Sequence, residues 1–282
     1  MYTAMHSYSY RDRFKEPEFG PREFVAEVGK HGFRSVEIMT GTPGNIQKHI
    51  GTDDIAKLRE LQAFGRDHGV EIHCLSTYND FSLLDVGRRQ EQIDDLKKWT
   101  GIAGKLGIPN IRLLTGYYTE SNEFEKQEQL TLDGIRECVS EAEAAGVYMA
   151  LENHSTVFVS GNDVAWVIEQ IGSKSVTACP DPSNMMPGFH EASPKAQSFV
   201  YAGAAKMAKY ATNSHLKVKG INEDGTLIGW NIDRLLGVYA RAGYEGPITF
   251  ESIIPENLTM QLPAIKKIVD DAIERVSAVA AR

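Results

Sequence analysis

The chain has 282 residues, of which 42% are hydrophobic and 24% charged, and its formal net charge is −8. The acidic balance argues against a nucleic-acid partner, because such partners are held by basic surfaces. No apolar run approaches the roughly 20 residues that cross a bilayer, and the N-terminal segment lacks the features of a secretion signal. Three cysteines without a close pair are typical of a reducing compartment. We therefore expect a cytoplasmic protein with neither a membrane nor a nucleic acid as partner.

A short motif, in which glycine precedes an apolar residue, recurs along the chain. It occurs at 31–33, 68–70, 106–108, 145–147 and 242–244. Each copy follows a segment with apolar residues three or four apart, such as Ile55, Leu58 and Leu61, and precedes a short apolar run. A glycine just past a helix adopts the left-handed conformation without a Cβ clash, so that a strand can begin at once. The repeated helix–glycine–strand unit predicts parallel strands joined by helices.

Eight such strands are predicted, with helical patterns between them and a final helix over about 259–280. The strands span about 3–9, 33–38, 70–76, 109–115, 147–153, 175–180, 213–218 and 247–252. We expect an α/β fold, a (β/α)8 TIM barrel, for which about 250 residues are typical. No linker divides the chain, so residues 1–282 are expected to form a single domain. The alternative, a doubly wound open sheet, usually has a glycine-rich loop after its first strand, whereas the sequence here is YRDR at 10–13.

Ionisable residues stand at the ends of the last four predicted strands, where TIM barrels carry their active sites. They are Glu152, Asp181, His215 and Glu251. Three buried carboxylates are costly without a counter-charge, which one divalent cation can supply. Three oxygens and one imidazole suit Mn²⁺, and also Mg²⁺, Co²⁺, Fe²⁺ or Zn²⁺. For each residue taken alone, a solvated or ion-paired side chain is the alternative, but four on successive strand ends favour a metal.

Four segments around these residues resemble the sugar phosphate isomerase/epimerase superfamily, the xylose-isomerase-like barrels. The segments are ALENH at 150–154, DPSN at 181–184, HLKVKG at 215–220 and GYEGPITFES at 243–252. The resemblance covers nearly the whole chain and is greatest for the branch with ketose 3-epimerases, inosose dehydratases and oxo-glycoside-processing enzymes. It implies that Glu152, Asp181, His215 and Glu251 bind the metal. It also implies that Glu152 and Glu251 serve as acid and base.

The sequence departs from those epimerases at positions near the expected substrate. Asn184 stands where they have a histidine three residues after the metal aspartate, and GIN at 220–222 stands where they have an arginine. His154 shares a strand face with Glu152, at a position where the epimerases commonly have a smaller polar residue. Two roles are open for His154, a second general base and a group that supports the metal site.

Three further residues are candidates for contact with the substrate or the metal site. Lys217 faces the same way as His215 and would bind a substrate oxygen, stabilise an oxyanion, or pair with a ligand carboxylate. Glu37, at the end of the second strand, would hold a substrate hydroxyl or close an ion pair. Trp230 lies in a loop after the seventh strand and is a candidate wall of the site.

The remaining candidates lie on earlier strands. His6 is expected on the first strand together with Tyr8 and Tyr10, where it would line the pocket, with ordinary packing as the alternative. His73 lies inside a strand and is expected to be a hydrogen-bonded core histidine. Arg112 is expected to face inward and to orient a carboxylate.

The resemblance implies a divalent-metal-dependent sugar isomerase or epimerase that abstracts a proton next to a carbonyl and passes through a metal-stabilised enediolate. The main alternative is a lyase, dehydratase or deglycosidase that cleaves an oxidised (3-oxo) sugar or glycoside by β-elimination. A metal-containing sugar-binding subunit is the non-enzyme alternative. A DNA-repair endonuclease of the same barrel class is disfavoured, because it needs more histidines on the second and third strands. The expected partner is a small-molecule sugar or glycoside, and the sequence leaves a homo-oligomer or a hetero-complex open.

Overall fold

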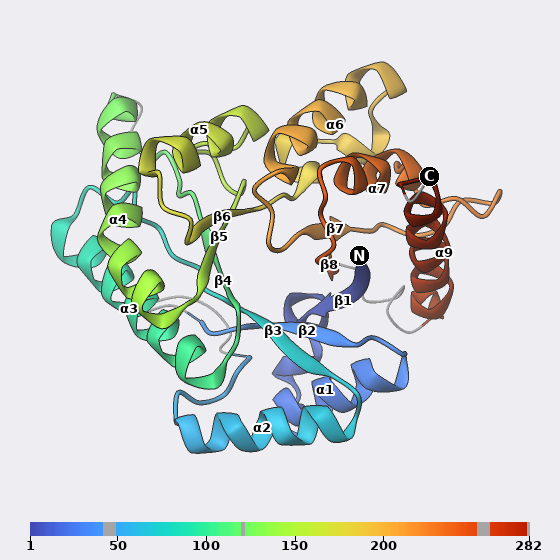
Figure 1. Cartoon of the computed structure of the whole chain (residues 1–282), viewed down its shortest axis with the longest axis horizontal. Coiled ribbons are helices and arrows are strands. Elements are labelled where there is room, and N and C mark those ends of the chain that lie inside the picture. Colours follow the sequence, from blue (N-terminus) through green and yellow to red (C-terminus); the bar gives the residue numbers. More distant parts are fainter. Residues whose placement is uncertain (42–48, 120–121, 253–259, 281–282) are drawn as a thin grey trace.

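The strands lie in one curled sheet in a computed structural model that describes residues 1–41, 49–119, 122–252 and 260–280 (Figure 1). Their order in the sheet is β6-β5-β4-β3-β2-β1-β8-β7, and all paired neighbours are parallel. The strands are β1 (Tyr2–His6), β2 (Ser35–Met39), β3 (Glu71–Ser76), β4 (Asn110–Leu114), β5 (Tyr148–Glu152), β6 (Val176–Cys179), β7 (His215–Lys217) and β8 (Pro247–Glu251).

The sheet closes into a barrel between β6 and β7. Backbone hydrogen bonds run from Thr212 N to Ala178 O (3.1 Å) and from His215 N to Pro180 O (3.0 Å). The predicted (β/α)8 TIM barrel is therefore confirmed, and each predicted strand coincides with an observed one to within a few residues.

Helices surround the barrel on its outside (Figure 1). Those described are α1 (Pro21–Lys30), α2 (Ile55–Asp67), α3 (Val86–Leu106), α4 (Phe124–Ala145), α5 (Gly161–Ile171), α6 (Pro194–Ala208), α7 (Ile232–Arg241) and α9 (Leu262–Ala280). Gly107 and Gly146 end α3 and α4 with φ of 67° and 66°, as the repeated motif predicts. Residue 259, where the last helix was expected to begin, lies outside the described residues. None of the described helices is long and apolar enough to cross a membrane.

The first strand ends before the predicted span of about 3–9 does. It ends at His6, and the chain turns into a 3₁₀ helix over Ser7–Tyr10. The turn is stabilised because Tyr8 N donates a hydrogen bond to His6 Nδ1 (2.9 Å). Tyr10 is buried and its ring packs against Phe24, with 5.1 Å between the ring centroids. The prediction that Tyr8 and Tyr10 share a strand with His6 is therefore wrong.

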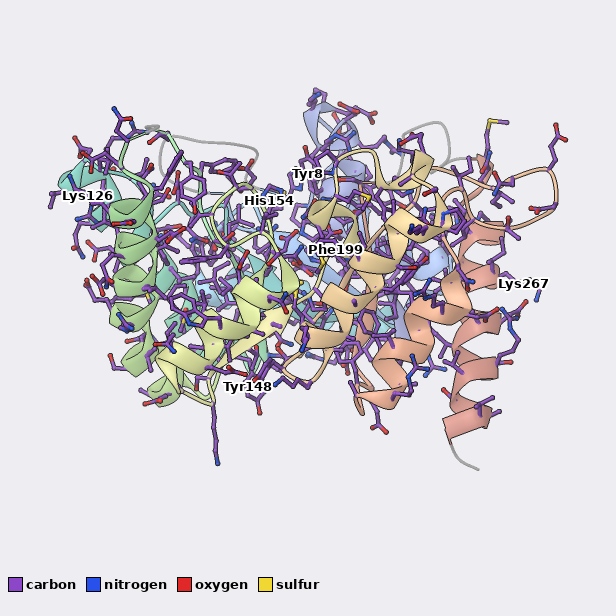
Figure 2. The ribbon with its side chains drawn as sticks, turned by 90° about the horizontal axis from the view of Figure 1, so that it is seen from above. Tyr8, Lys126, Tyr148, His154, Phe199 and Lys267 are labelled. Atoms are coloured by element: carbon purple, nitrogen blue, oxygen red, sulfur yellow. The ribbon has the colours of Figure 1, made fainter. Side chains whose placement is uncertain are left out.

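Alternation along the strands separates an apolar outer layer from a polar barrel interior. On β2, Val36 and Ile38 belong to the hydrophobic core, whereas Glu37 contacts side chains from β1, β3 and β7 across the barrel. In the side view of Figure 2, Tyr8 and His154 lie toward the upper end and Tyr148, the first residue of β5, lies at the lower end. The carboxyl ends of the strands therefore face the upper end in that view.

Candidate metal centre

The four predicted ligands meet where the last four strands end. Glu152 and Glu251 are the last residues of β5 and β8, His215 is the first residue of β7, and Asp181 follows β6 by two residues. All four are buried. Each offers one ligand atom, and these atoms all lie within 4.8 Å of one another. The structure thus brings the predicted set together, and its binding of a metal stays a prediction.

One atom of each of these residues makes no hydrogen bond within the described part of the chain. The atoms are Glu152 Oε2, Asp181 Oδ2, His215 Nδ1 and Glu251 Oε2. The three carboxylate atoms have ion-pair contacts with Arg112 or Lys217, whereas His215 Nδ1 faces carboxylates. Buried polar atoms nearly always have a hydrogen-bond partner. A divalent cation would satisfy all four atoms at once, and oxygen with imidazole is a donor set that Mn²⁺, Mg²⁺ and Co²⁺ accept. The residues therefore fit a single divalent cation.

The charges around this set also match one divalent cation. One buried and one partly buried cation lie among four buried carboxylates. The ion pairs are those of Arg112 Nε with Glu152 Oε2 (3.3 Å) and Glu37 Oε1 (3.6 Å), and of Lys217 Nζ with Asp181 Oδ2 (2.9 Å) and Glu251 Oε2 (3.4 Å). With the carboxylates ionised and His215 in the neutral form that binds a metal, these described side chains carry two uncompensated negative charges. One divalent cation balances them.

The surroundings keep the carboxylates in their charged form. Burial opposes the charge of Glu152, yet His215 and Arg112 hold its pKa well below the ordinary range. Burial also opposes the charge of Glu251, and Lys217 with His215 nevertheless lowers its pKa to about 2. The Lys217 ammonium is disfavoured by burial, but the facing carboxylates raise its pKa. Both glutamates are therefore ionised at neutral pH.

Asn184 bridges a predicted ligand and Lys217. Its Nδ2 donates a hydrogen bond to Glu152 Oε1 (3.1 Å), and its Oδ1 accepts one from Lys217 Nζ (2.6 Å). The 3₁₀ helix Pro182–Met185, which follows Asp181 directly, gives Asn184 this position. Asn184 thus contacts the ligand set, while its predicted role in substrate binding stays a prediction.

His154 lies beside the ligand set in the loop between β5 and α5. Its Nδ1 is 2.7 Å from Ser155 Oγ, and no hydrogen bond to its Nε2 is present among the described residues. Its half-buried ring makes edge contacts with Tyr78 and Tyr117, at 6.2 and 6.3 Å between centroids. The hydroxyls of these tyrosines are 2.8 Å apart. This arrangement leaves His154 Nε2 available for proton transfer.

Glu37 lies on the opposite side of His215 from the other three carboxylates. Its Oε2 accepts hydrogen bonds from His215 Nε2 (3.0 Å) and Asn213 Nδ2 (2.7 Å), and its Oε1 accepts one from Ser76 Oγ. The side chain is fully buried. Of the two roles expected for Glu37, this placement supports the ion pair and argues against contact with a substrate hydroxyl, because both carboxylate oxygens are engaged.

His6 is also fully buried, which argues against the predicted pocket-lining position. Its Nδ1 accepts a hydrogen bond from Tyr8 N, and its Nε2 lies 3.0 Å from Ser76 Oγ. His6, Glu37 and His215 are close enough together to hold a metal ion themselves. The hydrogen bonds already made by His6 and Glu37 point instead to a closed network.

Trp230 does not present its ring to the site. Its Nε1 donates a hydrogen bond to Lys217 O (2.8 Å), and its ring packs on Phe189 with 4.4 Å between centroids. The residue is 6% exposed. Its position therefore supports the backbone of β7 at Lys217, and the predicted substrate contact has no support from this placement.

Two interior residues lie as predicted, and two were missed. Arg112 faces inward between Glu37 and Glu152, and His73 is a hydrogen-bonded core histidine, 2.7 Å from Ser35 Oγ. Asn213 and Ser76 were not among the predicted site residues. Asn213 precedes His215 by two residues, so alternation places both side chains on one face, and Ser76 ends β3. Both signals were present in the sequence.

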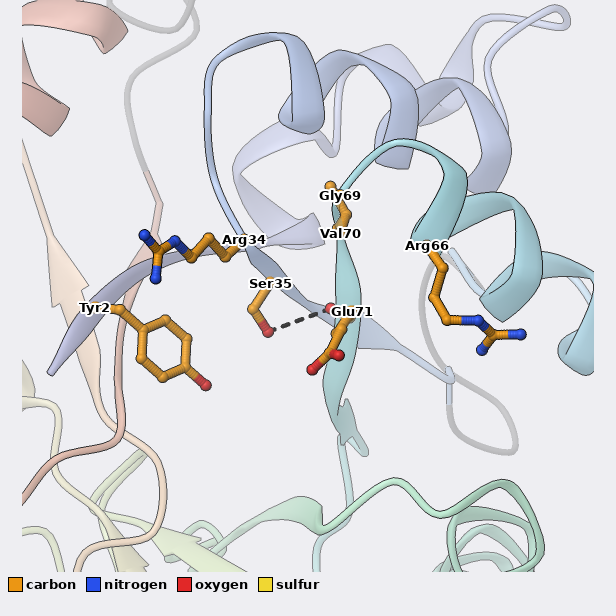
Figure 3. A pocket seen from close by; sticks show the side chains of 7 residues that line it. All are labelled: Tyr2, Arg34, Ser35, Arg66, Gly69, Val70 and Glu71. Atoms are coloured by element: carbon orange, nitrogen blue, oxygen red, sulfur yellow. Dashed lines mark hydrogen bonds between the residues drawn. The ribbon is translucent and has the colours of Figure 1, made fainter.

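A separate pocket of about 540 Å³ opens at the other end of the barrel, beside the first residues of β1, β2 and β3 (Figure 3). It is lined by Tyr2, Arg34, Ser35, Arg66, Gly69, Val70 and Glu71. Figure 3 shows the two guanidinium groups pointing away from each other. Active sites of TIM barrels lie at the opposite end, so the pocket has no part in the chemistry considered below.

Comparison with known proteins identifies the family. A family model described as xylose isomerase-like TIM barrel matches residues 25–276, and the chain therefore belongs to this family. This confirms the resemblance seen in the sequence. No curated protein sequence matches the chain.

Solved structures show the same fold along the whole chain. One is D-psicose 3-epimerase from Clostridium cellulolyticum H10 with D-tagatose, at 17% identity and a TM-score of 0.69, covering 100% of this chain and 98% of that chain. Another is a xylose isomerase-like TIM barrel protein from Mycobacterium smegmatis in complex with magnesium. It has 16% identity and a TM-score of 0.70, and the match covers 99% of this chain and 97% of that chain. A third is 3-keto-D-glucoside 4-epimerase from E. coli, at 13% identity and 0.68, covering 99% of both chains. At these identities the likeness concerns the fold.

Proposed function

We propose that the chain is a divalent-metal-dependent sugar isomerase or epimerase that moves a proton at the carbon next to a carbonyl group. The observation that carries this proposal is the buried set Glu152, Asp181, His215 and Glu251, in which one ligand atom of each residue lies within 4.8 Å of the others. Each of the four residues also has one atom without a hydrogen bond among the described residues. Family membership and the sugar epimerases among the similar structures support it. Mn²⁺, Mg²⁺ or Co²⁺ held by these residues would act as a Lewis acid toward a sugar oxygen.

Glu152 and Glu251 are the groups proposed to move the proton. Both are ionised, so either can accept a proton from carbon at neutral pH. Return of the proton to the opposite face of the same carbon is epimerisation, and return to the neighbouring carbon is isomerisation. Asn184 holds Glu152 Oε1 at 3.1 Å, which leaves Oε2 without a hydrogen bond among the described residues.

Lys217 is proposed to stabilise negative charge that develops on the substrate. Its Nζ lies 2.6 Å from Asn184 Oδ1 and 2.9 Å from Asp181 Oδ2, so its position is determined from two sides. A preorganised cation aimed at a developing oxyanion lowers the barrier without further reorganisation.

A lyase acting on an oxidised sugar or glycoside is the second candidate, and His154 is the observation that favours it. β-Elimination removes the proton next to the carbonyl, while the leaving oxygen departs with its bonding electrons and takes up another proton. His154 Nε2, beside Glu152 and without a hydrogen bond from a described residue, is suited to supply that proton. The similar E. coli structure is named for a 3-keto-D-glucoside, so 3-oxo-glucosides belong among the substrates to test.

Proton exchange in D2O tests the proposed function and separates it from the second candidate. The Mn²⁺-loaded protein is incubated with D-fructose, D-psicose, D-tagatose and a 3-oxo-glucoside, and the products are followed by ¹H NMR. Deuterium next to the carbonyl together with a new sugar supports the isomerase or epimerase. Release of the aglycone from the 3-oxo-glucoside, without a new sugar from the free ketoses, supports the lyase.

The control is Glu152→Gln, which should show no exchange. If the loaded wild type binds a sugar but exchanges no deuterium in any of them, the enzyme proposal fails. The non-enzyme alternative, a sugar-binding subunit, then stands.

A further inference from the structure

The two nitrogens of the His215 ring face different surroundings. Nε2 lies 3.0 Å from Glu37 Oε2, whereas Nδ1 lies 3.4 Å from Glu152 Oε1 and 3.7 Å from Glu251 Oε2. The ring is buried, and Nδ1 makes no hydrogen bond to any described residue. The ring can therefore serve the predicted ligand set through Nδ1 only, because Nε2 is engaged by Glu37.

Glu37 itself is held in one orientation. Asn213 Nδ2 donates to the same Oε2 at 2.7 Å, and Ser76 Oγ donates to Oε1 on the other side. Asn213 is fixed in turn, since its Oδ1 accepts from Thr249 Oγ1 at 3.2 Å. The groups that contact the carboxylate come from β1, β3, β4, β7 and the residues just before β7, so they surround it from several strands of the barrel wall.

The chemistry of these contacts determines where the imidazole proton lies. An ionised carboxylate only accepts hydrogen bonds, so the contact of 3.0 Å requires Nε2 to carry the proton. In the neutral ring, Nδ1 would then carry the lone pair, and it faces Glu152 and Glu251. A neutral histidine with this proton arrangement is the form that binds a metal through Nδ1.

We propose that Glu37 is a positioning residue that presents His215 to the divalent cation through Nδ1, by accepting the Nε2 proton. The inference rests on the proposed metal centre and assigns Glu37 a role that involves no contact with substrate. Removing such a partner of a metal-bound histidine typically lowers metal affinity about 10- to 100-fold.

The test is Glu37→Gln, which keeps the shape of the side chain and removes its charge. The amide places a donor on one side of the group, where the carboxylate had only acceptors. We expect the dissociation constant for Mn²⁺, measured by electron paramagnetic resonance of the free ion, to rise about 10- to 100-fold. Glu191→Gln is the matched control. It makes the same change at an exposed carboxylate that pairs with Lys219, so its Mn²⁺ affinity should stay close to that of the wild type.

A second measurement needs no variant of Glu37 and therefore does not depend on how that variant folds. In the wild type labelled with ¹⁵N-histidine and loaded with Zn²⁺, long-range ¹H–¹⁵N correlation reports which ring nitrogen carries the proton. His215→Gln assigns the signal. We expect a protonated Nε2 and a metal-bound Nδ1 for His215.

The outcomes separate the inference from the proposal on which it rests. If the wild type binds no divalent cation, the metal centre itself is refuted. If the wild type binds Mn²⁺ and Glu37→Gln binds it equally well, the metal centre stands and the role of Glu37 is refuted. A protonated Nδ1 in the Zn²⁺-loaded wild type also overturns the role of Glu37.

Discussion

Lys217 shares two carboxylates with the proposed cation, which makes Lys217→Met a sensitive test of the site. Its Nζ lies 2.9 Å from Asp181 Oδ2 and 3.4 Å from Glu251 Oε2, and both residues belong to the predicted ligand set. Removing the ammonium should therefore destabilise the chelated enzyme much more than the Mn²⁺-loaded enzyme, in which the bound cation neutralises these carboxylates.

The size of the effect follows from these distances. Coulomb's law at an effective dielectric constant of about 20 gives about 5–6 kcal/mol for each contact, before the cost of desolvating the ammonium. Breaking a buried pair by removing one partner costs about 3–5 kcal/mol net. Since the Lys217 side chain is 21% exposed, we expect a loss of about 3 kcal/mol, the lower end of this range. For a chain of this size, that corresponds to a fall in Tm of about 5 °C.

The assay is thermal unfolding of both proteins with a chelator and with saturating Mn²⁺. Lys217→Met should be less stable than the wild type mainly in the chelated sample. Its Tm should therefore rise more than that of the wild type when Mn²⁺ is added. Lys219→Met is the matched control, since Lys219 pairs with Glu191 at an exposed site and its loss should change stability by less than about 1 kcal/mol. An equal fall in Tm with and without Mn²⁺ would refute the claim that Lys217 and the cation contact the same carboxylates.

Three further predictions concern neighbouring residues. Asn184→Ala should lower kcat about 10- to 100-fold, because hydrogen bonds to charged groups contribute about 1.5–3 kcal/mol. Elemental analysis should find its metal content unchanged, and loss of the metal would contradict this prediction. His154→Gln should also keep its metal and should slow elimination from a 3-oxo-glucoside about 10²- to 10⁴-fold, and undiminished turnover would exclude His154 as the acid. Burial lowers the pKa of His73 to about 4, from about 6.5 when unfolded. The unfolded chain therefore takes up this proton first, and stability falls by about 3 kcal/mol as the pH drops from about 6.5 to 4. Urea denaturation at pH 7 and 4.5 should show this fall in the free energy of unfolding in the wild type and not in His73→Gln. An equal pH dependence in the two proteins would contradict the role of His73.

Much of the fold was predictable because its signals are local. Glycine at the end of a helix, as at Gly107 and Gly146, depends only on the backbone of its own turn. The first strand shows where local reasoning fails. The predicted strand extends to about residue 9, but the side chain of His6 accepts the backbone N–H of Tyr8 and ends the strand. Such a bond between a side chain and the backbone competes with the sheet, and the residue types alone do not report it.

The candidate site was predictable for its ligand set but not for the contacts between opposite strands. The rule that strand ends carry chemistry, together with the family resemblance, selected Glu152, Asp181, His215 and Glu251, whose ligand atoms the structure brings within 4.8 Å of one another although His215 begins its strand. Alternation shows which face of a strand a residue occupies, but it does not show what lies opposite. Glu37 meets His215 from a position 178 residues away. Its role therefore depends on barrel closure, which no local pattern reports.

The metal content of the purified protein tests the central claim most directly. After incubation with Mn²⁺ and removal of the free ion, the wild type should contain close to one equivalent of the metal per chain by elemental analysis. Asp181→Ala should retain its circular dichroism spectrum and lose the metal, because one of the four ligand atoms is gone. A wild type without bound metal, or a full equivalent in Asp181→Ala, would contradict the proposed centre.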